Sequence, residues 1–366
     1  MRNKTKNNPN TALLISIFLL SLIGILALTT ASAPLSVKAG NSPSYYLFNQ
    51  LIRGLIPGLI LGFIAFKIPL NFYKKYSLFF FIAAVILTLA VFIPGLSKTE
   101  GGATRWLDLG LFSFQPSELL KLTSILYLSA ILSSNRPIKK RLPAFFLVLG
   151  LIALALILQS NLSTLIIISA ISCIIFFCAK TPLIYNLLIW IGGILLAAAL
   201  IIFAPYRMQR FLTFLHPEND PLGVGYHINQ ALIAIGSGGL FGSGLGFSAQ
   251  KLGFLPEATS DSIFAIYAEE MGFIGCFFLI ASFLMFAVNS FLVFKKSADN
   301  FNKLVAVGIG SWIVIQAFVN IGAMTGLMPL SGTPLPFITA GGTHMVAELI
   351  ACGILLKIST ETKNES

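Results

Sequence analysis

The sequence contains few charged residues. Asp, Glu, Lys and Arg together account for 10% of the 366 residues, whereas hydrophobic residues account for 56% and the mean hydropathy is +0.89. So few charges cannot cover the surface of a water-soluble protein of this length. The composition therefore excludes a soluble globular enzyme and predicts an integral membrane protein.

Cysteine and histidine are also scarce. The four cysteines lie in apolar runs and are Cys173, Cys178, Cys276 and Cys352. Their spacing excludes a disulfide framework and a zinc site. The three histidines are His216, His227 and His344. Because they are too dispersed for a metal site, we interpret each as structural and predict no metal site and no certain cofactor; assistance by a divalent cation stays open.

The sequence also lacks a basic stripe. Its net charge is +11, but the 24 Lys and Arg residues are scattered in small groups beside hydrophobic runs. This placement argues against nucleic acid as a partner and indicates membrane topology instead.

Long apolar runs are abundant. A segment of roughly 20 apolar residues spans a bilayer as a helix, which satisfies its own backbone hydrogen bonds. We predict an all-α polytopic membrane protein, a single domain over residues 1–366, with about ten transmembrane helices. The runs are 12–31, 51–67, 77–95, 117–133, 142–158, 162–179, 184–204, 265–294, 304–323 and 343–358.

The cations fix the predicted orientation. With a cytoplasmic N-terminus, 16 of the 24 Lys and Arg residues lie on the cytoplasmic side, as the positive-inside rule requires. Both termini are then cytoplasmic, and a large loop, residues 204–262, faces outward between the seventh and eighth helices. Ala31-Ser32-Ala33 resembles a signal-peptidase site. However, the preceding run is long enough to span the bilayer, so we expect it to be retained, with cleavage left open.

Two outward segments, 94–117 and 204–262, are rich in Gly, Pro and polar residues, and nine of the thirteen acidic residues lie on the outward side. Acidic residues contribute little to orientation, so this clustering needs another explanation. We interpret the longer segment as a folded, partly re-entrant element. Its glycine run at 236–246 suits either a phosphate cradle or a re-entrant turn.

The first candidate residues flank the start of the predicted fourth helix. Glu118 and Lys121 are spaced i,i+3, so they share a helical face. They form either an ion pair that locks the helices together or a site in which Lys121 holds an anionic head group. Arg105 and Trp106 lie just upstream: the guanidinium can bind phosphate in bidentate fashion, and the indole suits an interfacial anchor.

The second set lies in the large loop. Glu257 and Asp261 are spaced i,i+4, so in a helix both carboxylates would share a face, and one would act as a general base. The alternatives are solvated loop carboxylates, or Ser260 or Asp261 as an N-cap. Further cations of the loop that could stabilise a phosphate are Arg207, Arg210 and Lys251.

In combination, these motifs resemble the SEDS family (shape, elongation, division and sporulation proteins), which includes FtsW, RodA and SpoVE. The resemblance runs over almost the whole chain. It is carried by Arg105-Trp106, Gln115-Pro116-Ser117-Glu118 with Lys121, Asp220-Pro221-Leu222-Gly223, Gln250-Lys251, Leu255-Pro256-Glu257 with Asp261, and Pro334-Leu335-Pro336-Phe337. The Gln250-Lys251 and Leu255 to Asp261 segments are closer to the FtsW and SpoVE branch than to RodA.

The resemblance implies a peptidoglycan glycosyltransferase. Such proteins polymerise lipid II, an undecaprenyl-pyrophosphate-linked disaccharide peptide, outside the cytoplasmic membrane, together with a class B penicillin-binding protein that cross-links the strands. The family's catalytic aspartate falls on Asp261, and the cations listed above would stabilise the pyrophosphate leaving group. The chain departs from the family at Gln159-Ser160-Asn161, where a proline, an aspartate and a glycine are usual.

Two other functions stay open. A lipid II flippase would use the same cations but would need no base, and a non-catalytic scaffold would recruit a penicillin-binding protein. The residues do not decide between division, elongation and sporulation, and they do not fix the stem-peptide preference.

Overall fold

A computed structural model describes residues 9–100, 103–108, 110, 113–202, 205–220 and 223–362. Every predicted apolar run overlaps a helix. The helices are α1 (Thr11–Lys38), α3 (Ile56–Lys67), α4 (Leu70–Ala90), α5 (Pro116–Leu132), α6 (Ile138–Leu158), α7 (Leu162–Cys178), α8 (Leu183–Ile202), α11 (Ile263–Lys296), α12 (Asn300–Met324) and α13 (Gly342–Thr362). A short helix α2 (Tyr45–Gln50) and a π-helical turn η1 (Leu51–Leu55) lead into α3.

Seven helical segments within the described residues are long and apolar enough to cross a membrane, the α2 to α3 segment being one of them. Helices α5 and α7, of 17 residues each, are shorter than these seven segments. The predicted number of about ten spans therefore stays a prediction. The tripeptide Ala31-Ser32-Ala33 lies inside α1, with Ala31 and Ser32 buried.

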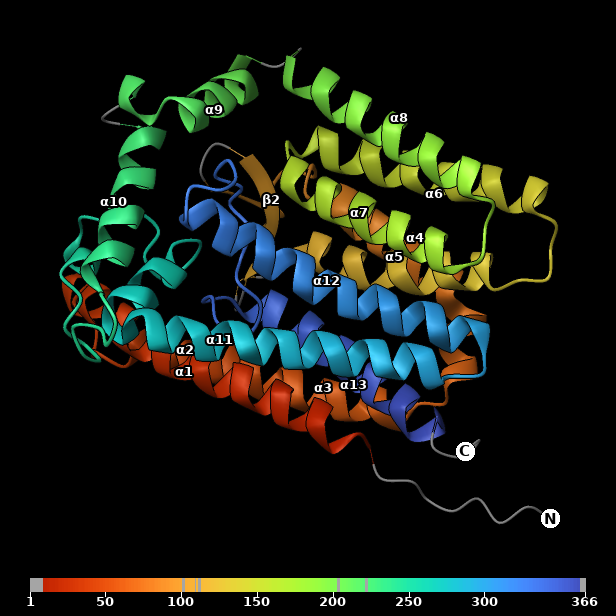
Figure 1. The fold of residues 1–366 in the computed structure, drawn as a ribbon, viewed down its shortest axis with the longest axis horizontal. Helices are drawn as coiled ribbons and strands as arrows, with labels where there is room; N and C mark the ends of the chain where they lie inside the picture. The colour runs from red at the N-terminus through yellow and green to blue at the C-terminus, as the bar shows by residue number, and fades with distance from the viewer. Residues whose placement is uncertain are drawn as a thin grey trace.

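The long helices lie side by side in one bundle (Figure 1). Helix α12 packs against α5, α7, α11 and α13 and buries three large or polar side chains, Trp312, Gln316 and Asn320. Helix α13 packs along α3, where a Cβ on Gly353 would lie 2.1 Å from the carbonyl oxygen of Gly62. Such close backbone approach is typical of membrane helices, whose association relies on small residues and van der Waals packing.

The expectation of a purely α-helical protein is wrong in one segment. Residues 97–114 contain three short antiparallel strands in the order β1 (Ser97–Glu100), β2 (Ala103–Asp108) and β3 (Ser113–Phe114). β-Branched and aromatic residues such as Thr104 and Trp106 favour a pleated, half-buried surface. With strands of two to six residues, the segment shows no periodicity long enough to predict a sheet.

The large loop is folded. It contains α9 (Pro205–Leu215), a 3-10 turn η2 (Pro217–Asn219), α10 (Val224–Ser237) and a second 3-10 turn η3 (Gln250–Leu252). These elements gather at one end of the bundle, whereas α1 begins and α13 ends at the opposite end (Figure 1). The loop thus builds one end of the molecule.

The glycine run of the loop wraps around a break in α11. At Gly272 the backbone leaves helical geometry, with φ 63° and ψ −166°. Main-chain hydrogen bonds from the loop replace the lost helical ones: Ser243 N donates to Glu269 O at 2.9 Å, and Phe273 N donates to Gly239 O at 2.9 Å. The run therefore serves as a backbone clamp on α11.

Candidate active site

A cavity of about 150 Å³ lies where the loop meets α12. Its walls come from α9, α10, the turn that precedes α11, the last turns of α12, and the proline-rich segment after α12. The lining residues are Arg210, Val224, His227, Glu257, Asp261, Asn320, Ala323, Met324, Leu330, Ser331, Gly332 and Thr333. Three sequence-predicted site residues, Arg210, Glu257 and Asp261, are thus brought together.

Glu257 and Asp261 do not lie in a helix but in consecutive turns. Glu257 has φ 51°, and its carbonyl oxygen accepts hydrogen bonds from Ser260 N at 3.0 Å and Ser262 N at 3.1 Å. The Ser260 hydroxyl donates to the Glu257 carboxylate at 2.6 Å. The N-cap residue of α11 is Ser262, which makes no side-chain capping bond. Asp261 is therefore free of a capping role, and the tight turn, rather than a shared helical face, presents both carboxylates.

The pKa of Asp261 is raised from 3.8 to about 6. Burial is the largest cause, the negative charge of Glu257 acts in the same direction, and the guanidinium groups of Arg210 and Arg105 oppose both. Loss of hydration penalises the charged form of a carboxyl group, and a second carboxylate acts in the same direction. The result is a carboxyl group that is mostly ionised at neutral pH but is still basic enough to accept a proton.

Asn320 fixes the turn that carries Asp261. Its Nδ2 donates to the carbonyl oxygen of Asp261 at 2.9 Å and to that of Thr333 at 2.8 Å. Gly332, at φ 65°, lies so close that a Cβ there would be 3.3 Å from Oδ2 of Asp261. The end of α12 thereby holds the loop and the proline-rich segment in register around the carboxylate.

His227, from α10, lies beside the same turn. Its Nε2 is 2.6 Å from the Ser262 hydroxyl, which in turn donates to the Pro256 carbonyl oxygen at 2.8 Å. Since a hydroxyl has one proton to donate, Nε2 must carry the hydrogen, which leaves Nδ1 as an acceptor in the neutral ring. Burial lowers the pKa of His227, so the ring is neutral at pH 7.

The two arginines with described side chains reach the site from different elements. Arg210 Nη1 is 3.5 Å from the Leu330 carbonyl oxygen. Arg105 lies in β2, and its guanidinium donates to Ser160 O at 2.6 Å and to Gln159 O at 3.4 Å. The turn at Gln159 and Ser160, where the sequence departs from the SEDS pattern, therefore binds this arginine through main-chain carbonyls.

Trp106 and Arg207 are less closely tied to the cavity. Trp106 is half-buried in β2, beside a register irregularity at Arg105, and is not among the residues that line the cavity. The backbone of Arg207 lies in α9, and its side chain lies outside the described residues.

Glu118 and Lys121 form a buried ion pair. The Lys121 ammonium is 2.8 Å from Glu118 Oε2, and the two side chains are only 2% and 3% exposed. Lys121 also donates to Gln316 Oε1 at 2.7 Å and lies over the ring of Trp312. Gln316 Nε2 donates onward to the Pro334 carbonyl oxygen at 3.0 Å. The pair thus connects α5, α12 and the proline-rich segment that lines the cavity.

Lys251 is also buried in an ion pair, with its ammonium 2.6 Å from Glu270 Oε1. The neighbouring Glu269 accepts a hydrogen bond from Ala249 N at 2.9 Å and another from the Ser248 hydroxyl. These contacts attach η3 to α11 just before the break at Gly272. The structure thus places Lys251 in a structural network and not in the lining of the cavity.

Sequence reasoning missed two residues of the site. His227 was interpreted as structural, although its position in the large polar loop was a signal for a second role. Asn320 is a polar residue inside an apolar run, and such residues usually face a cavity or a partner group.

Among the described residues, no three His, Cys, Asp or Glu side chains come together as metal ligands. What the cavity can supply is a carboxylate base, a neutral imidazole and fixed guanidinium charge.

Comparison with known proteins identifies the fold and its relatives. A family model of cell cycle proteins, which covers FtsW, RodA and SpoVE, matches residues 10–364. The probable peptidoglycan glycosyltransferase FtsW of Coxiella burnetii is 36% identical over 352 residues, covering 93% of this chain and 94% of that protein. The protein of the same name from Nitrosomonas europaea is 38% identical over 361 residues, covering 96% and 93%.

Solved structures share the architecture. A chain of a peptidoglycan synthase complex, described as coordinating polymerization and crosslinking, aligns with a TM-score of 0.80 at 23% identity, covering 98% of this chain and 99% of that one. The rod shape determining protein RodA of Thermus thermophilus aligns with a TM-score of 0.70 at 23% identity, covering 96% of each chain. At these identities the likeness establishes the fold.

Proposed function

The chain belongs to the cell cycle protein family of FtsW, RodA and SpoVE, and we propose that it is a peptidoglycan glycosyltransferase that polymerises lipid II. It is a multi-pass protein of the bacterial cytoplasmic membrane. The observation that carries the proposal is the Asp261 carboxyl group, whose pKa of about 6 suits a general base at neutral pH, in a cavity with Arg210.

In the proposed reaction, Asp261 removes the proton from the 4-hydroxyl of the acceptor sugar. The alkoxide oxygen attacks the anomeric carbon of the donor, and the bond from that carbon to the pyrophosphate oxygen breaks. Undecaprenyl pyrophosphate leaves with the electron pair, so negative charge develops on it. Fixed guanidinium groups stabilise such charge best, because they need no reorganisation during the reaction.

Arg105 and Arg210 are the described cations whose charge acts on Asp261, and we assign the pyrophosphate to their side of the cavity. Arg207 lies one helical turn before Arg210 in α9, and we assign it to the pyrophosphate as well. The ion pair of Lys121 and Glu118 does not line the cavity but supports the proline-rich segment that forms one of its walls. The cavity volume of about 150 Å³ lies below the roughly 300 to 1,000 Å³ of pockets that enclose whole ligands. Only the reacting hydroxyl and the anomeric centre would enter it, and the sugars would lie over its mouth.

We also propose a topology of ten spans with both termini in the cytoplasm. Its support is that α1 begins and α13 ends at the same end of the bundle, opposite the elements of the large loop (Figure 1). The active site then faces outward, where a class B penicillin-binding protein would cross-link the strands.

The proposal assigns no resident metal. Because the two arginines supply the charge, polymerisation of labelled lipid II should continue after chelation of divalent cations.

The experiment is to supply labelled lipid II to the purified full-length protein, alone and with a co-expressed class B penicillin-binding protein, and to separate the products on a gel. Ladders of glycan strands are expected. If neither preparation makes polymer, the enzyme proposal is wrong; lipid II translocation in vesicles would then indicate a flippase, and its absence a scaffold.

A further inference from the structure

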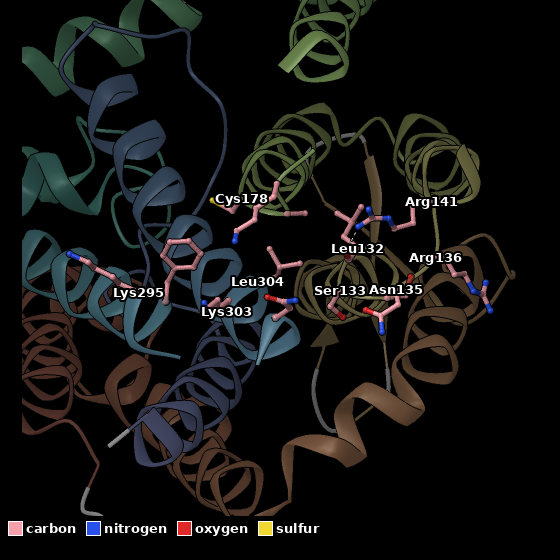
Figure 2. Close-up of a pocket in the computed structure, with 14 residues that line it drawn as sticks. Leu132, Ser133, Asn135, Arg136, Arg141, Cys178, Lys295, Lys303 and Leu304 are labelled. Carbon is pink, nitrogen blue, oxygen red and sulfur yellow. Dashed lines mark hydrogen bonds between the residues drawn. The ribbon is translucent and has the colours of Figure 1, made fainter. Parts of the chain in front are cut away.

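A second cavity, of about 410 Å³, lies at the other end of the bundle (Figure 2). It is formed where the connections between α5 and α6, α7 and α8, and α11 and α12 meet. Its lining contains five basic side chains, from all three connections: Arg136, Arg141, Lys180, Lys295 and Lys303. Figure 2 shows Arg136 and Lys295 on opposite sides, with Lys303 and Leu304 between them.

The lining contains no carboxylate among the residues that the structure describes. Asp299, beside the lining residue Asn300, is engaged elsewhere: it lies 4.0 Å from the ammonium of Lys74 and accepts hydrogen bonds from two N–H groups at the start of α12. Glu361 accepts a hydrogen bond from the amide of Asn302 at 3.5 Å. Five positive charges around one cavity repel one another, and an anion between them would relieve this repulsion.

Two of the cations are fixed by the backbone. Arg141 Nη1 donates to the Leu132 carbonyl oxygen at 2.8 Å, which holds the guanidinium against the cavity wall. Lys180 follows the end of α7 with φ 56°, a position where glycine is the usual residue. Glycine would adopt this left-handed conformation at lower cost, and Lys180 occupies it in the wall of the cavity.

The rest of the lining is of two kinds. Ser133, Ser134 and Asn135 contribute hydroxyl and amide groups that can donate hydrogen bonds to an anionic oxygen, and Leu132, Phe294 and Leu304 contribute apolar surface. The positive-inside rule accounts for cations at this end of the bundle. It does not account for their convergence on one cavity, because Lys139 and Lys140, in the first turn of α6 at the same end, lie outside the lining.

We propose that this cavity binds a phosphate group, carried either by an anionic phospholipid of the cytoplasmic leaflet or by soluble inorganic phosphate. The volume matches that of ligand pockets, and basic pockets between membrane helices on the cytoplasmic side are suited to anionic head groups. The cytoplasmic location rests on the proposed topology; the presence of a phosphate site does not depend on the proposed enzymatic activity.

The test uses the full-length protein in uncharged detergent, with phosphatidylglycerol as one probe and inorganic phosphate as the other, and measures retained ligand by native mass spectrometry. The site variant is Lys180→Gln with Lys303→Gln, and the matched control, which removes the same charge from the same end, is Lys139→Gln with Lys140→Gln. At about fivefold per cation, the site variant, which loses two cations, should bind the probe about 30-fold more weakly, and the control should bind it like the wild type.

Retention of phosphatidylglycerol but not of inorganic phosphate identifies the lipid as the source, and the reverse identifies a soluble anion; both support the site. Equal weakening in both variants would reduce the effect to general surface charge and overturn the proposal, as would failure of the wild type to retain either probe. Thermal unfolding without ligand shows whether each variant is folded. Polymerisation of lipid II is measured separately, so that failure of the enzyme proposal and failure of this site are distinguishable.

Discussion

The carboxyl group of Asp261 loses hydration when the chain folds, and this one change affects both chemistry and stability. Burial raises the pKa of the group to about 6, so only about a tenth of it is ionised at pH 5 and nearly all at pH 8. A general base must be ionised to act. We expect the rate of polymerisation at pH 5 to be about tenfold below that at pH 8, with an apparent pKa near 6. A rate that is flat from pH 5 to 8 would contradict the role of Asp261.

The same pKa predicts a stability change. The pKa of Asp261 in the folded protein lies above the ordinary value of 3.8. The protonated carboxyl group therefore stabilises the folded state fully below pH 3.8, and this stabilisation is lost as the pH rises through 6. Asp261→Asn removes the buried charge. At pH 8 the variant should be more stable than the wild type by on the order of 1 to 3 kcal/mol, and at pH 5 by about half as much. Thermal unfolding in detergent at both pH values tests this, and a destabilised variant at pH 8 would contradict it.

At the scale of elements, the backbone clamp between the glycine run and α11 supports the structure on which the site is built. Gly242 has φ 83°, and a Cβ there would lie 2.1 Å from the carbonyl oxygen of Glu270. Gly239 also has a positive φ, 53°, but has open space around it. Gly242→Ala should therefore cost several kcal/mol and abolish activity, whereas Gly239→Ala should cost about 1 kcal/mol. Thermal unfolding and polymer yield measure both, and similar losses in the two variants would refute the clamp.

The Lys251 to Glu270 ion pair attaches η3 to α11 and yields a second prediction. Removing one partner leaves an unpaired buried charge, so Lys251→Met should destabilise the protein by about 3 to 5 kcal/mol. Adding Glu270→Leu removes the second charge and should restore most of the stability and the polymerase activity. If the double variant is stable but inactive, Lys251 acts on the substrate and not only on the fold.

Sequence and structure agree at this scale where the physics is local. Apolar runs such as 304–323 predict helices because a backbone in lipid must satisfy its own hydrogen bonds. The break at Gly272 was not predictable, since it lies inside an apolar run and depends on hydrogen bonds from the distant glycine run. The ion pair of Lys251 and Glu270 likewise depends on that turn. Glu118 and Lys121, one helical turn apart, were predictable as a pair.

At the scale of the whole molecule, the proposed topology predicts which loops face the medium. In a variant without the four native cysteines, Ser42→Cys, in the exposed turn after α1, should react with a membrane-impermeant maleimide on intact cells. Ala298→Cys, in the exposed turn between α11 and α12, should react only after lysis. Labelling of Ala298→Cys on intact cells would reverse the orientation and place the Asp261 site in the cytoplasm.

The composition predicted the membrane class, and the ordered motifs predicted Asp261 as the base. The sequence did not predict the assembly of the cavity, because its walls come from segments more than a hundred residues apart, such as α9 and residues 331–333. His227 and Asn320 join Asp261 only through this packing. Their roles follow from their hydrogen bonds to the Ser262 hydroxyl and to the Asp261 carbonyl oxygen.

The central claim is that Asp261 is the base for glycan polymerisation. The most direct measurement compares lipid II polymerisation by wild type and Asp261→Asn side by side, at equal amounts of folded protein and with the same class B partner. The account predicts glycan ladders from the wild type and none from the folded Asp261→Asn protein. Substantial polymer from that variant would contradict it.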